Sequence, residues 1–341
     1  MGKSKTKTAI KRICLVFFST LLMVLLAVVG VVYIILCGPS ESAQELLARS
    51  LKETSAVGFI ADIFLPAQRV AEIMNDKDAV FETESMDTSL VVLPTAQKES
   101  SVQDDEGLQG TEDENGIEFV EITGASYRGI LMIVKDPTRI FVGVPSSFGD
   151  AGLTLEKMVE KYDAVGGINA GGFEDPNGTG KGGTPEGIVI TNGNLVWGSA
   201  ETMSTVIGFD QEGLLHVGYM SAQQALNNHL WWACSFGPAL IVNGEAINNG
   251  TITSSGINPR TAIGQRADGA VLLLVVDGRQ ITSLGATYED LISIMLEHGA
   301  VNAANLDGGS SSQMIYNGEA LNINASVKGT RPLPTTFLVR K

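Results

Sequence analysis

The sequence is short of the two residue types that most often build disulfide frameworks and zinc sites. It has three cysteines and three histidines in 341 residues. Cys14 and Cys37 lie at the two ends of an apolar run, which leaves Cys234 alone in the rest of the chain, so no intradomain disulfide can form. A lone cysteine in an apolar stretch is more often a small buried residue than a nucleophile. The histidines are scattered without the spacing of a zinc site.

The sequence also has no basic run after residue 12. The first twelve residues hold Lys3, Lys5, Lys7, Lys11 and Arg12 and no acid, which gives +5. The whole chain carries -15, so the remainder carries -15 - 5 = -20. A domain this acidic, without a basic patch, is not expected to bind nucleic acid. The excess of acidic residues is explained by the need to keep the domain soluble.

Two well-known catalytic motifs are missing. No Gly-x-Ser-x-Gly sequence occurs, which argues against a serine triad. The glycine-rich stretch around Lys181 resembles a phosphate loop only weakly, because Gly182 follows the lysine where Ser or Thr would be needed. No internal repeat is found. What the sequence does contain is a long apolar segment, an acidic tract and several glycine-rich polar clusters.

The apolar segment, residues 13–37, holds 25 residues without a charge. This exceeds the roughly 20 residues that span a bilayer, and it is longer than the apolar region of a signal peptide. The positive-inside rule places the basic tail, residues 1–12, in the cytoplasm. Cleavage or lipidation near Cys37 is disfavoured by the bulky Ile35 and Leu36. We therefore predict a single-pass signal-anchor in the cell membrane and an extracellular C-terminal domain.

The segment after the anchor is predicted to form a stalk and a linker. Residues 42–75 carry apolar residues at mixed three- and four-residue spacing, interrupted by Pro66. Within a stalk of residues 38–94 these helices could mediate self-association, or they could simply lie on a surface. Residues 82–121 hold twelve acids and one base, Lys98. Such composition does not fold alone, so residues 95–116 are predicted to be a flexible linker.

Residues 117–341 are predicted to form one folded α+β domain. Short β-branched runs bounded by turn residues outnumber the helices, and the two kinds of element do not alternate strictly, which indicates a mixed, strand-rich sheet with a few packed helices. Helices are expected at residues 154–162, 221–228 and 288–298. Strands are expected at residues 126–135, 139–144, 164–169, 187–191, 205–209, 240–242, 260–265, 270–276, 300–306, 313–316 and 335–339.

Four clusters in this domain hold more polar groups than turns need. The first follows a predicted strand and places Asn169 and Glu174 in a glycine-rich setting, where a ligand can approach the backbone closely. The second joins Arg260 and Thr261 with Asp277 and Arg279, a set that could hold an anion or form a structural ion pair.

The third and fourth clusters lie nearer the C-terminus. In the third, a predicted strand ends in Asn305, Leu306 and Asp307, followed by Gly308, Gly309, Ser310, Ser311 and Ser312. Backbone N–H groups in such a turn can bind an anion, and Asp307 could act as acid, base or nucleophile. Here a functional role is favoured over a plain turn. In the fourth, Arg331 stands before the last strand and could add a further cation.

Taken in order, these clusters resemble the phosphodiester glycosidase family over residues 120–341. Two positions differ from the family pattern: Ser310 stands where a third glycine is expected, and Gly172 where an aromatic residue often follows. The ordered set is more specific than any of its members, which are Ile168-Asn169-Ala170-Gly171 with Phe173, Pro185-Glu186-Gly187, Gly237-Pro238-Ala239-Leu240, Asn258-Pro259-Arg260-Thr261, Asp277-Gly278-Arg279, Asn305-Leu306-Asp307-Gly308-Gly309 and Arg331-Pro332.

The resemblance implies hydrolysis of a bond between a sugar and a phosphodiester. The anchor and the lack of disulfides look more like a bacterial surface protein than the eukaryotic members, so the substrate would be a phosphate-linked cell-wall glycan or exopolysaccharide. Catalysis would rest on Asp307, Asp277 or Glu174. No cofactor is required, although a divalent cation at Asp277 or Asp307 stays an open alternative. The expected substrate-binding residues are Asn169, Arg260, Thr261, Arg279, Asn305, Gly308, Gly309, Ser310, Ser311 and Arg331.

Three other functions fit the same sequence. A non-catalytic module that binds anionic glycans would keep the arginines but tolerate loss of Asp307. A transferase of exopolysaccharide biosynthesis would need an acceptor and show little hydrolysis. A scaffold that assembles through its stalk would lose function when the stalk is deleted, while Asp307→Asn would have no effect.

Overall fold

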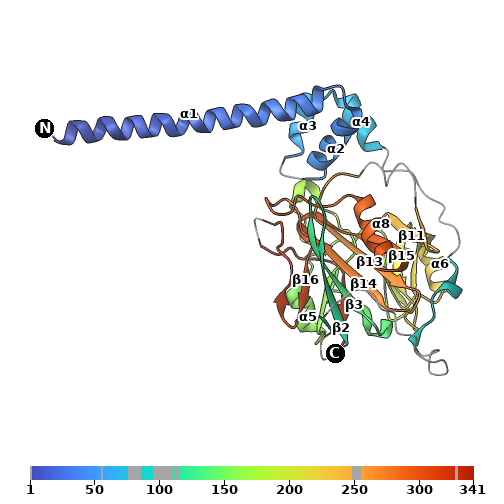
Figure 1. Ribbon diagram of the computed structural model, residues 1–341. Coiled ribbons are helices and arrows are strands. Elements are labelled where there is room, and N and C mark those ends of the chain that lie inside the picture. The colour runs from blue at the N-terminus through green and yellow to red at the C-terminus, as the bar shows by residue number, and fades with distance from the viewer. Residues whose placement is uncertain are drawn as a thin grey trace.

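The computed structural model describes residues 2–54, 57–75, 86–94, 111–112, 116–247, 255–326 and 329–341. Its first element is a single long helix, α1 (Gly2–Cys37), which projects from the rest of the molecule (Figure 1). Within Ile10–Cys37 an 18-residue window has a mean hydropathy of 2.9 and is almost entirely exposed. The helix is long and apolar enough to be a single-pass anchor or a signal sequence.

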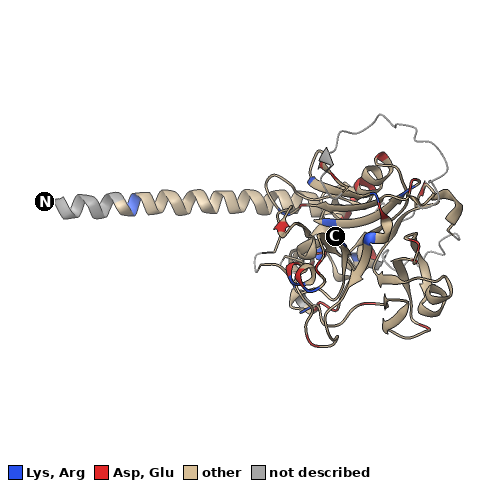
Figure 2. Cartoon of the chain, turned by 90° about the horizontal axis from the view of Figure 1, so that it is seen from below, with Lys and Arg blue, Asp and Glu red and all other residues tan. Residues whose placement is uncertain are grey.

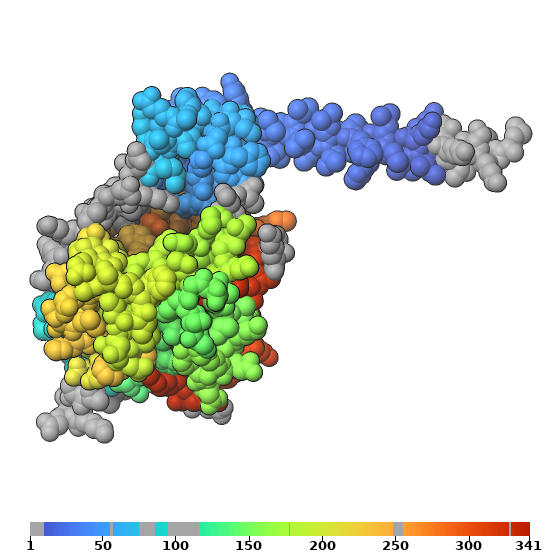
Figure 3. All heavy atoms as spheres, turned by 180° about the vertical axis from the view of Figure 1, so that it is seen from behind, coloured from blue at the N-terminus to red at the C-terminus, as the bar shows by residue number. Residues whose placement is uncertain are grey.

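Three short helices follow α1 and form a separate lobe, which Figure 3 shows in light blue against the remainder of the chain. They are α2 (Glu41–Lys52), α3 (Phe59–Phe64) and α4 (Ala67–Asn75). The predicted restart of the helix after Pro66 is confirmed, whereas α2 ends at Lys52 rather than continuing. Leu36 at the end of α1 packs with Ala48, Leu65, Val70 and Ile73, so the lobe has a small core of its own.

The end of the predicted stalk lies on the folded domain. The Val92 N–H donates to the carbonyl of Ala267 over 2.8 Å, and the Asp87 N–H donates to the Asn243 side chain over 2.7 Å. Of the predicted linker, residues 95–110 and 113–115 lie outside the described residues. Thr111–Glu112 form strand β1, which pairs with β2.

The folded domain is built from three sheets in which every described strand pair is antiparallel, and the predicted mixed α+β class is confirmed. The eight-stranded sheet has the order β1-β2-β3-β14-β13-β15-β11-β12, and the two five-stranded sheets have the orders β17-β16-β5-β18-β4 and β7-β6-β10-β8-β9. Their strands are β2 (Ile117–Thr123), β3 (Arg128–Val134), β4 (Ile140–Gly143), β5 (Gly166–Asn169), β6 (Val189–Thr191), β7 (Asn194–Trp197), β8 (Met203–Phe209), β9 (Leu215–Ser221), β10 (Trp232–Ser235), β11 (Ala239–Val242), β12 (Glu245–Ala246), β13 (Arg260–Arg266), β14 (Val271–Val276), β15 (Ala300–Leu306), β16 (Met314–Tyr316), β17 (Glu319–Ala320) and β18 (Thr336–Val339).

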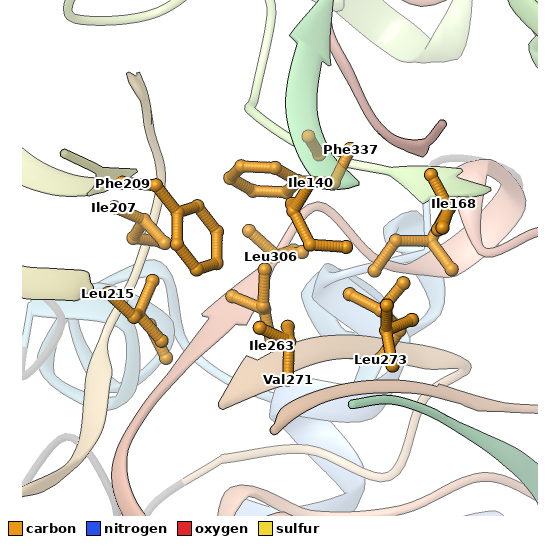
Figure 4. Close-up of a cluster of buried hydrophobic side chains, with 14 of the residues drawn as sticks. Ile140, Ile168, Ile207, Phe209, Leu215, Ile263, Val271, Leu273, Leu306 and Phe337 are labelled. Carbon is orange, nitrogen blue, oxygen red and sulfur yellow. The ribbon is translucent and has the colours of Figure 1, made fainter. Parts of the chain in front are cut away.

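One hydrophobic core joins the three sheets. Leu273 and Ile263 of the large sheet, Phe337 and Ile168 of the second sheet and Ile207 of the third meet in this cluster, as Figure 4 shows. Successive strand residues point to opposite faces of a sheet. A strand that is apolar throughout therefore needs apolar packing on both faces. In β14 the alternate residues Leu272, Leu274 and Val276 belong to a second cluster.

A helix covers the outer face of each sheet. Helix α8 (Tyr288–Glu297) packs on the large sheet, α5 (Leu155–Lys161) on the second and α6 (Ala222–Asn227) on the third. Figure 1 shows α8 beside β13, β14 and β15. Both α6 and α8 begin with a side-chain capping box, at Ser221 and Thr287. All three predicted helices are confirmed.

The register of the sheets brings several strand ends to one place. In the large sheet Thr261 near the start of β13 lies opposite Leu306 at the end of β15. In the second sheet Asn169 at the end of β5 lies opposite Thr336 at the start of β18. The carbonyl of Ser235, which ends β10 in the third sheet, accepts a hydrogen bond from the Gly172 N–H. Loops from all three sheets therefore converge.

Candidate active site

Asn169 ties together the strand ends at which the sheets meet. Its side chain is fully buried. Its Nδ2 donates to the main-chain carbonyl of Asp307 over 2.5 Å, and its Oδ1 accepts from the Thr261 hydroxyl (2.8 Å) and from the Gln313 N–H (3.1 Å). A buried amide with these bonds fixes the backbone on both sides of the site. The structure thus gives Asn169 and Thr261 positioning contacts with the protein.

Asp307 follows directly on the buried strand β15. Its N–H donates to the carbonyl of Ala170 over 2.9 Å, so the turn is held against the loop after β5. The pKa of Asp307 is raised to about 7, mainly because dense packing around the carboxyl removes water from it. The charge of Glu186 also raises this pKa, whereas the Ser311 hydroxyl, the Arg331 charge and the Gly308 N–H lower it. A carboxyl that titrates near neutrality is suited to proton transfer.

Glu186 is the second acidic group at this place, and it is not among the site residues predicted from the sequence. Its N–H donates to the carbonyl of Gly172 over 2.9 Å. A Cβ on Gly172 would lie 2.6 Å from the Glu186 Oε2 and 2.7 Å from the Phe236 ring, so a residue larger than glycine does not fit there. Burial raises the pKa of Glu186, and the charge of Glu174 raises it further. Glu186 thus lies between two other carboxylates, since the charge of Glu174 acts on it and its own charge acts on Asp307.

The signal for Glu186 was present in the sequence. Pro185-Glu186-Gly187 belongs to the ordered motif set, but an isolated glutamate before a strand looks like any surface acid. Only the contact between the Gly172 loop and residues 185–187 brings it near Asp307.

Arg331 is the cation of the site. Its Nη1 donates to Asp175 Oδ2 over 2.6 Å and to the Ser310 hydroxyl over 3.4 Å, and its Nη2 donates to the carbonyl of Gly180 over 3.1 Å. The guanidinium lies 4.8 Å from the centre of the Phe173 ring. Its charge also acts on Asp307. Arg331 is therefore fixed between a structural carboxylate and the proposed catalytic one.

The turn after Asp307 is held from several sides. Gly309 has φ of +61°, a left-handed conformation that suits glycine, and its N–H donates to the carbonyl of Pro259 over 2.8 Å. Ser311 is buried, while Ser310 faces Arg331. The Asn305 Nδ2 donates to the carbonyl of Gly237 over 2.7 Å, so its side chain braces β15. Within the part of the chain that the structure describes, the buried Asn305 Oδ1 has no hydrogen-bond partner.

Asp277 lies at the end of β14 and is bound by a neighbouring loop. Its Oδ1 accepts from the Asn322 side chain and from the Ile323 N–H, both over 3.1 Å. Burial raises the pKa of Asp277, and these two hydrogen bonds lower it. Among the described residues no group of three or more His, Cys, Asp or Glu side chains could hold a metal ion. A divalent cation at Asp277 or Asp307 stays a prediction.

The other two arginines predicted to bind substrate, Arg260 and Arg279, lie beneath the stalk lobe. Arg260 Nη2 donates to the carbonyl of Gly256 over 2.6 Å and to Glu53 Oε2 over 3.4 Å, and its guanidinium lies 4.3 Å from the centre of the Tyr288 ring. Arg279 Nη2 donates to Asn258 Oδ1 over 3.0 Å. Alternation along β13 sends Arg260 and Thr261 to opposite faces of the sheet. Arg260 is therefore separated from Asp307.

Glu53 makes a contact that sequence reasoning missed entirely. Its Oε2 accepts from Asn258 Nδ2 over 2.5 Å as well as from Arg260, and its carbonyl accepts from Arg279 Nη2 over 3.3 Å. The Arg279 guanidinium also lies next to Gly309. A Cβ built on Gly309 would be 3.4 Å from the Arg279 Nη2, which is a van der Waals contact distance. The segment that follows α2 thus reaches the edge of the Asp307 turn.

Comparison with known proteins identifies the family of the chain. A family model described as phosphodiester glycosidase matches residues 162–340, and the chain belongs to that family. The resemblance based on the ordered motifs is thereby confirmed. The site groups described above lie within the matched residues, with the exception of Glu53 on the stalk.

Curated relatives match parts of the chain. Mouse N-acetylglucosamine-1-phosphodiester alpha-N-acetylglucosaminidase is 26% identical over 217 residues, which are 57% of this chain and 41% of the mouse protein. The SPbeta prophage-derived uncharacterized protein YomE of Bacillus subtilis is 48% identical over 65 residues, 19% of this chain and 10% of that one. The chain thus spans well under two thirds of either relative.

A solved structure shares the fold. The catalytic domain of zebrafish N-acetylglucosamine-1-phosphodiester alpha-N-acetylglucosaminidase, described as auto-inhibited by its pro-peptide, superposes with a TM-score of 0.55 at 23% identity. The match covers 68% of this chain and 87% of that one.

The raised pKa of Asp307 predicts a distinctive dependence of stability on pH. Between the unfolded value of 3.8 and the folded value of about 7, the folded state binds more protons than the unfolded state. The free energy of unfolding contributed by Asp307 is therefore fully present below the unfolded pKa and falls as pH rises to about 7. Thermal unfolding of wild type and Asp307→Asn from pH 4 to 8 should show wild type losing stability relative to the variant over this range. Parallel curves would contradict it.

Proposed function

We propose that this chain hydrolyses the bond between a sugar and a phosphodiester in a phosphate-linked glycan. The observation that carries the proposal is the pair Asp307 and Glu186, two acids with raised pKa values set beside the fixed Arg331 where three sheets meet. Glycosidases use two carboxyl groups, one as acid and one as base or nucleophile. Membership of the phosphodiester glycosidase family and the names of the mammalian relatives support the same reaction.

The arrangement assigns a role to each group. Arg331, with the Ser310 hydroxyl, would hold the phosphate. Asp307, protonated up to about neutral pH, would give its proton to the phosphate oxygen as the bond from that oxygen to the sugar carbon breaks. Glu186, ionised, would take a proton from the water whose oxygen bonds to the sugar carbon. The products are a free sugar and a phosphomonoester, and the protons balance.

The substrate class is proposed from the anchor as well as the site. With α1 in a membrane and residues 1–12 in the cytoplasm, the domain would lie outside the cell, where phosphate-linked glycans of the cell wall and exopolysaccharide are found. The test is to incubate the full chain in detergent with sugar-1-phosphodiesters and to follow free sugar and phosphomonoester by NMR, with and without a chelator. Saturable binding without release would favour a non-catalytic module, and transfer to an added sugar would favour a transferase.

We also propose that the membrane-proximal segment restrains the site, in the way that the zebrafish catalytic domain is described as auto-inhibited by its pro-peptide. Glu53 places a carboxylate on Asn258 and Arg260 and its carbonyl on Arg279, which adjoins the turn after Asp307. A phosphate approaching Arg279 would have to displace this segment. Neutralising Glu53 weakens the contact because its bond to Arg260 is charge-assisted.

Glu53→Gln is therefore expected to lower the KM for a sugar phosphodiester by about tenfold, which corresponds to about 1.4 kcal/mol. Steady-state kinetics of the full chain measure it. Glu72→Gln is the matched control, because Glu72 lies in the same lobe and pairs with Arg69. An unchanged or raised KM in Glu53→Gln would show that the contact is purely structural.

A further inference from the structure

Two adjoining cavities lie at the end of the second sheet that is remote from Asp307. The first, about 390 Å³, is lined by Tyr162, Asp163, Asn192, Trp232 and Arg340 among others. The second, about 270 Å³, is lined by Thr138, Gln211 and Trp231 together with the same Trp232 and Arg340. Both cavities are lined by Trp232 and Arg340, and the two together are called here the Arg340 groove.

The Arg340 groove is separate from the candidate active site. Strands β5 and β18 pair so that Asn169 faces Thr336 at one end and Gly166 faces Val339 at the other. Asn169 holds Asp307, whereas Arg340 follows Val339. Three residues of strand span about 10 Å, so the two places lie at opposite ends of the sheet. One small ligand cannot fill both.

Arg340 is a preorganised cation at the centre of the groove. Its guanidinium lies 4.5 Å from the centre of the Phe141 ring and 5.4 Å from that of Trp232. Its Nη1 donates to the carbonyl of Thr138 over 2.9 Å. Within the described part of the chain, its Nε and Nη2 have no partner, so a planar pair of donors is available to an oxyanion.

Other cations gather around Arg340, although the chain carries -15 overall. The Arg139 guanidinium donates to the Arg340 carbonyl over 2.6 and 2.8 Å, and Lys341 pairs with Asp163. Figure 2 shows blue segments beside the C-terminus. The two acids at the groove are engaged, Asp163 by Lys341 and Asp210 by the Leu214 N–H and His216. The local charge therefore favours an anion.

Aromatic side chains also line the groove, although such residues are rare in this protein. Two of its three tryptophans, Trp231 and Trp232, line the groove, together with Tyr162. Aromatic rings offer flat apolar area with a polar edge, which suits the C–H faces of a sugar ring. The side chains of Asn192 and Gln211 supply amide donors and acceptors for hydroxyls.

We propose that the Arg340 groove is a second, non-catalytic binding site for a phosphate-bearing glycan. It rests on the proposed function in that the ligand would be another stretch of the same polymer. A chain held at Arg340 would be kept near Asp307 for repeated cleavage, because a second contact raises the effective concentration of the first. Small substrates would gain nothing from it.

The test uses the fluorescence of the groove tryptophans. In full-length protein in detergent carrying Trp197→Phe and Asp307→Asn, the only tryptophans are in the groove and hydrolysis is suppressed. Titration with α-glucose 1-phosphate should change the emission saturably, and methyl α-glucoside should bind at least about tenfold more weakly, the loss of about 1.4 kcal/mol expected for one charge-assisted contact. Equal responses to the two sugars would overturn the proposal.

Variants locate the contact. Arg340→Leu should abolish the response to the sugar phosphate, and Asn192→Asp, a change that adds a negative charge at the rim, should weaken it several-fold without disturbing packing. Arg266→Leu is the matched control, because Arg266 pairs with Asp268 at the β13–β14 turn and should leave the response unchanged. Binding that survives both groove variants, or that is lost equally in the control, would overturn the proposal.

Kinetics separate this inference from the proposed function. In otherwise wild-type protein, Arg340→Leu should slow hydrolysis of a phosphate-linked polymer but leave a small sugar phosphodiester unaffected. Groove binding without any hydrolysis would refute only the proposed function. Hydrolysis that is equally fast on both substrates in Arg340→Leu and wild type would refute only the groove.

Discussion

Replacing Asp307 with Asn is expected to lower the rate of sugar phosphodiester hydrolysis by about 10² to 10⁴-fold, the usual contribution of a general acid or base. The side chain keeps its size but can no longer give a proton to the leaving phosphate oxygen. The contacts that hold the turn come from the main chain of residue 307, whose N–H donates to Ala170 and whose carbonyl accepts from Asn169. These contacts survive the change, so the fold should be intact.

The measurement is kcat for release of free sugar by full-length protein, with thermal unfolding at pH 7 as the folding control. Asp150→Asn is the matched variant, because Asp150 is an exposed aspartate in a loop and should retain wild-type activity. A folded Asp307→Asn protein with more than about a tenth of the wild-type rate would remove Asp307 from the chemistry. It would leave Glu174 or Asp277 as the acid of the reaction.

Glu186→Gln should produce a loss of similar size, because the amide cannot take a proton from the attacking water. Part of the Glu186 side chain is exposed, and it makes no hydrogen bond to the protein among the described residues, so the variant is expected to fold, which thermal unfolding at pH 7 checks. Glu201→Gln, at another exposed position, is the control. Activity close to that of wild type in Glu186→Gln would leave Glu174 or Asp277 as the base.

The dependence of activity on pH distinguishes the two carboxyl groups. If Asp307 must be protonated, activity falls above about pH 7, the pKa that burial gives it. The Glu186 charge raises the pKa of Asp307, so in Glu186→Gln this alkaline limb should move to lower pH. An alkaline limb that stays in place would show that the two groups do not interact. Because the groups are coupled, the profile reports apparent values for the pair.

Local elements were predictable from the sequence because their signals are local. Thr287 and the apolar face of residues 288–298 predicted α8, and the β-branched, apolar residues 270–276 predicted the strand that forms β14. Strands β7 and β9 were missed because polar residues such as Asn194 and His216 interrupt their apolar pattern. Pairing with β6 and β8 supplies the stability that their composition does not indicate.

The site was only partly predictable from the sequence, because only some of its residues lie in a recognisable local pattern. Asp307, Arg331 and Asn169 were recognised because each lies in a polar, glycine-rich cluster after or before an apolar strand. Glu186 carries no such local signal, and Glu53 belongs to a segment whose pattern indicates only a stalk. Arg260 and Arg331, which the sequence grouped as one phosphate clamp, lie in different surroundings, because alternation along β13 sends Arg260 to the outer face of the sheet.

An apolar helix able to span a membrane, an acidic tract and a strand-rich domain with the ordered motifs of the phosphodiester glycosidases can all be read from the amino-acid order alone. Those features depend on composition and short spacings, which any stretch of chain carries with it. The folded chain is needed to show which carboxyl groups meet, that Glu53 reaches the arginines, and that Arg340 lies with two tryptophans at the opposite end of the sheet. Such contacts join residues far apart in the chain, and strand register, not sequence distance, sets them.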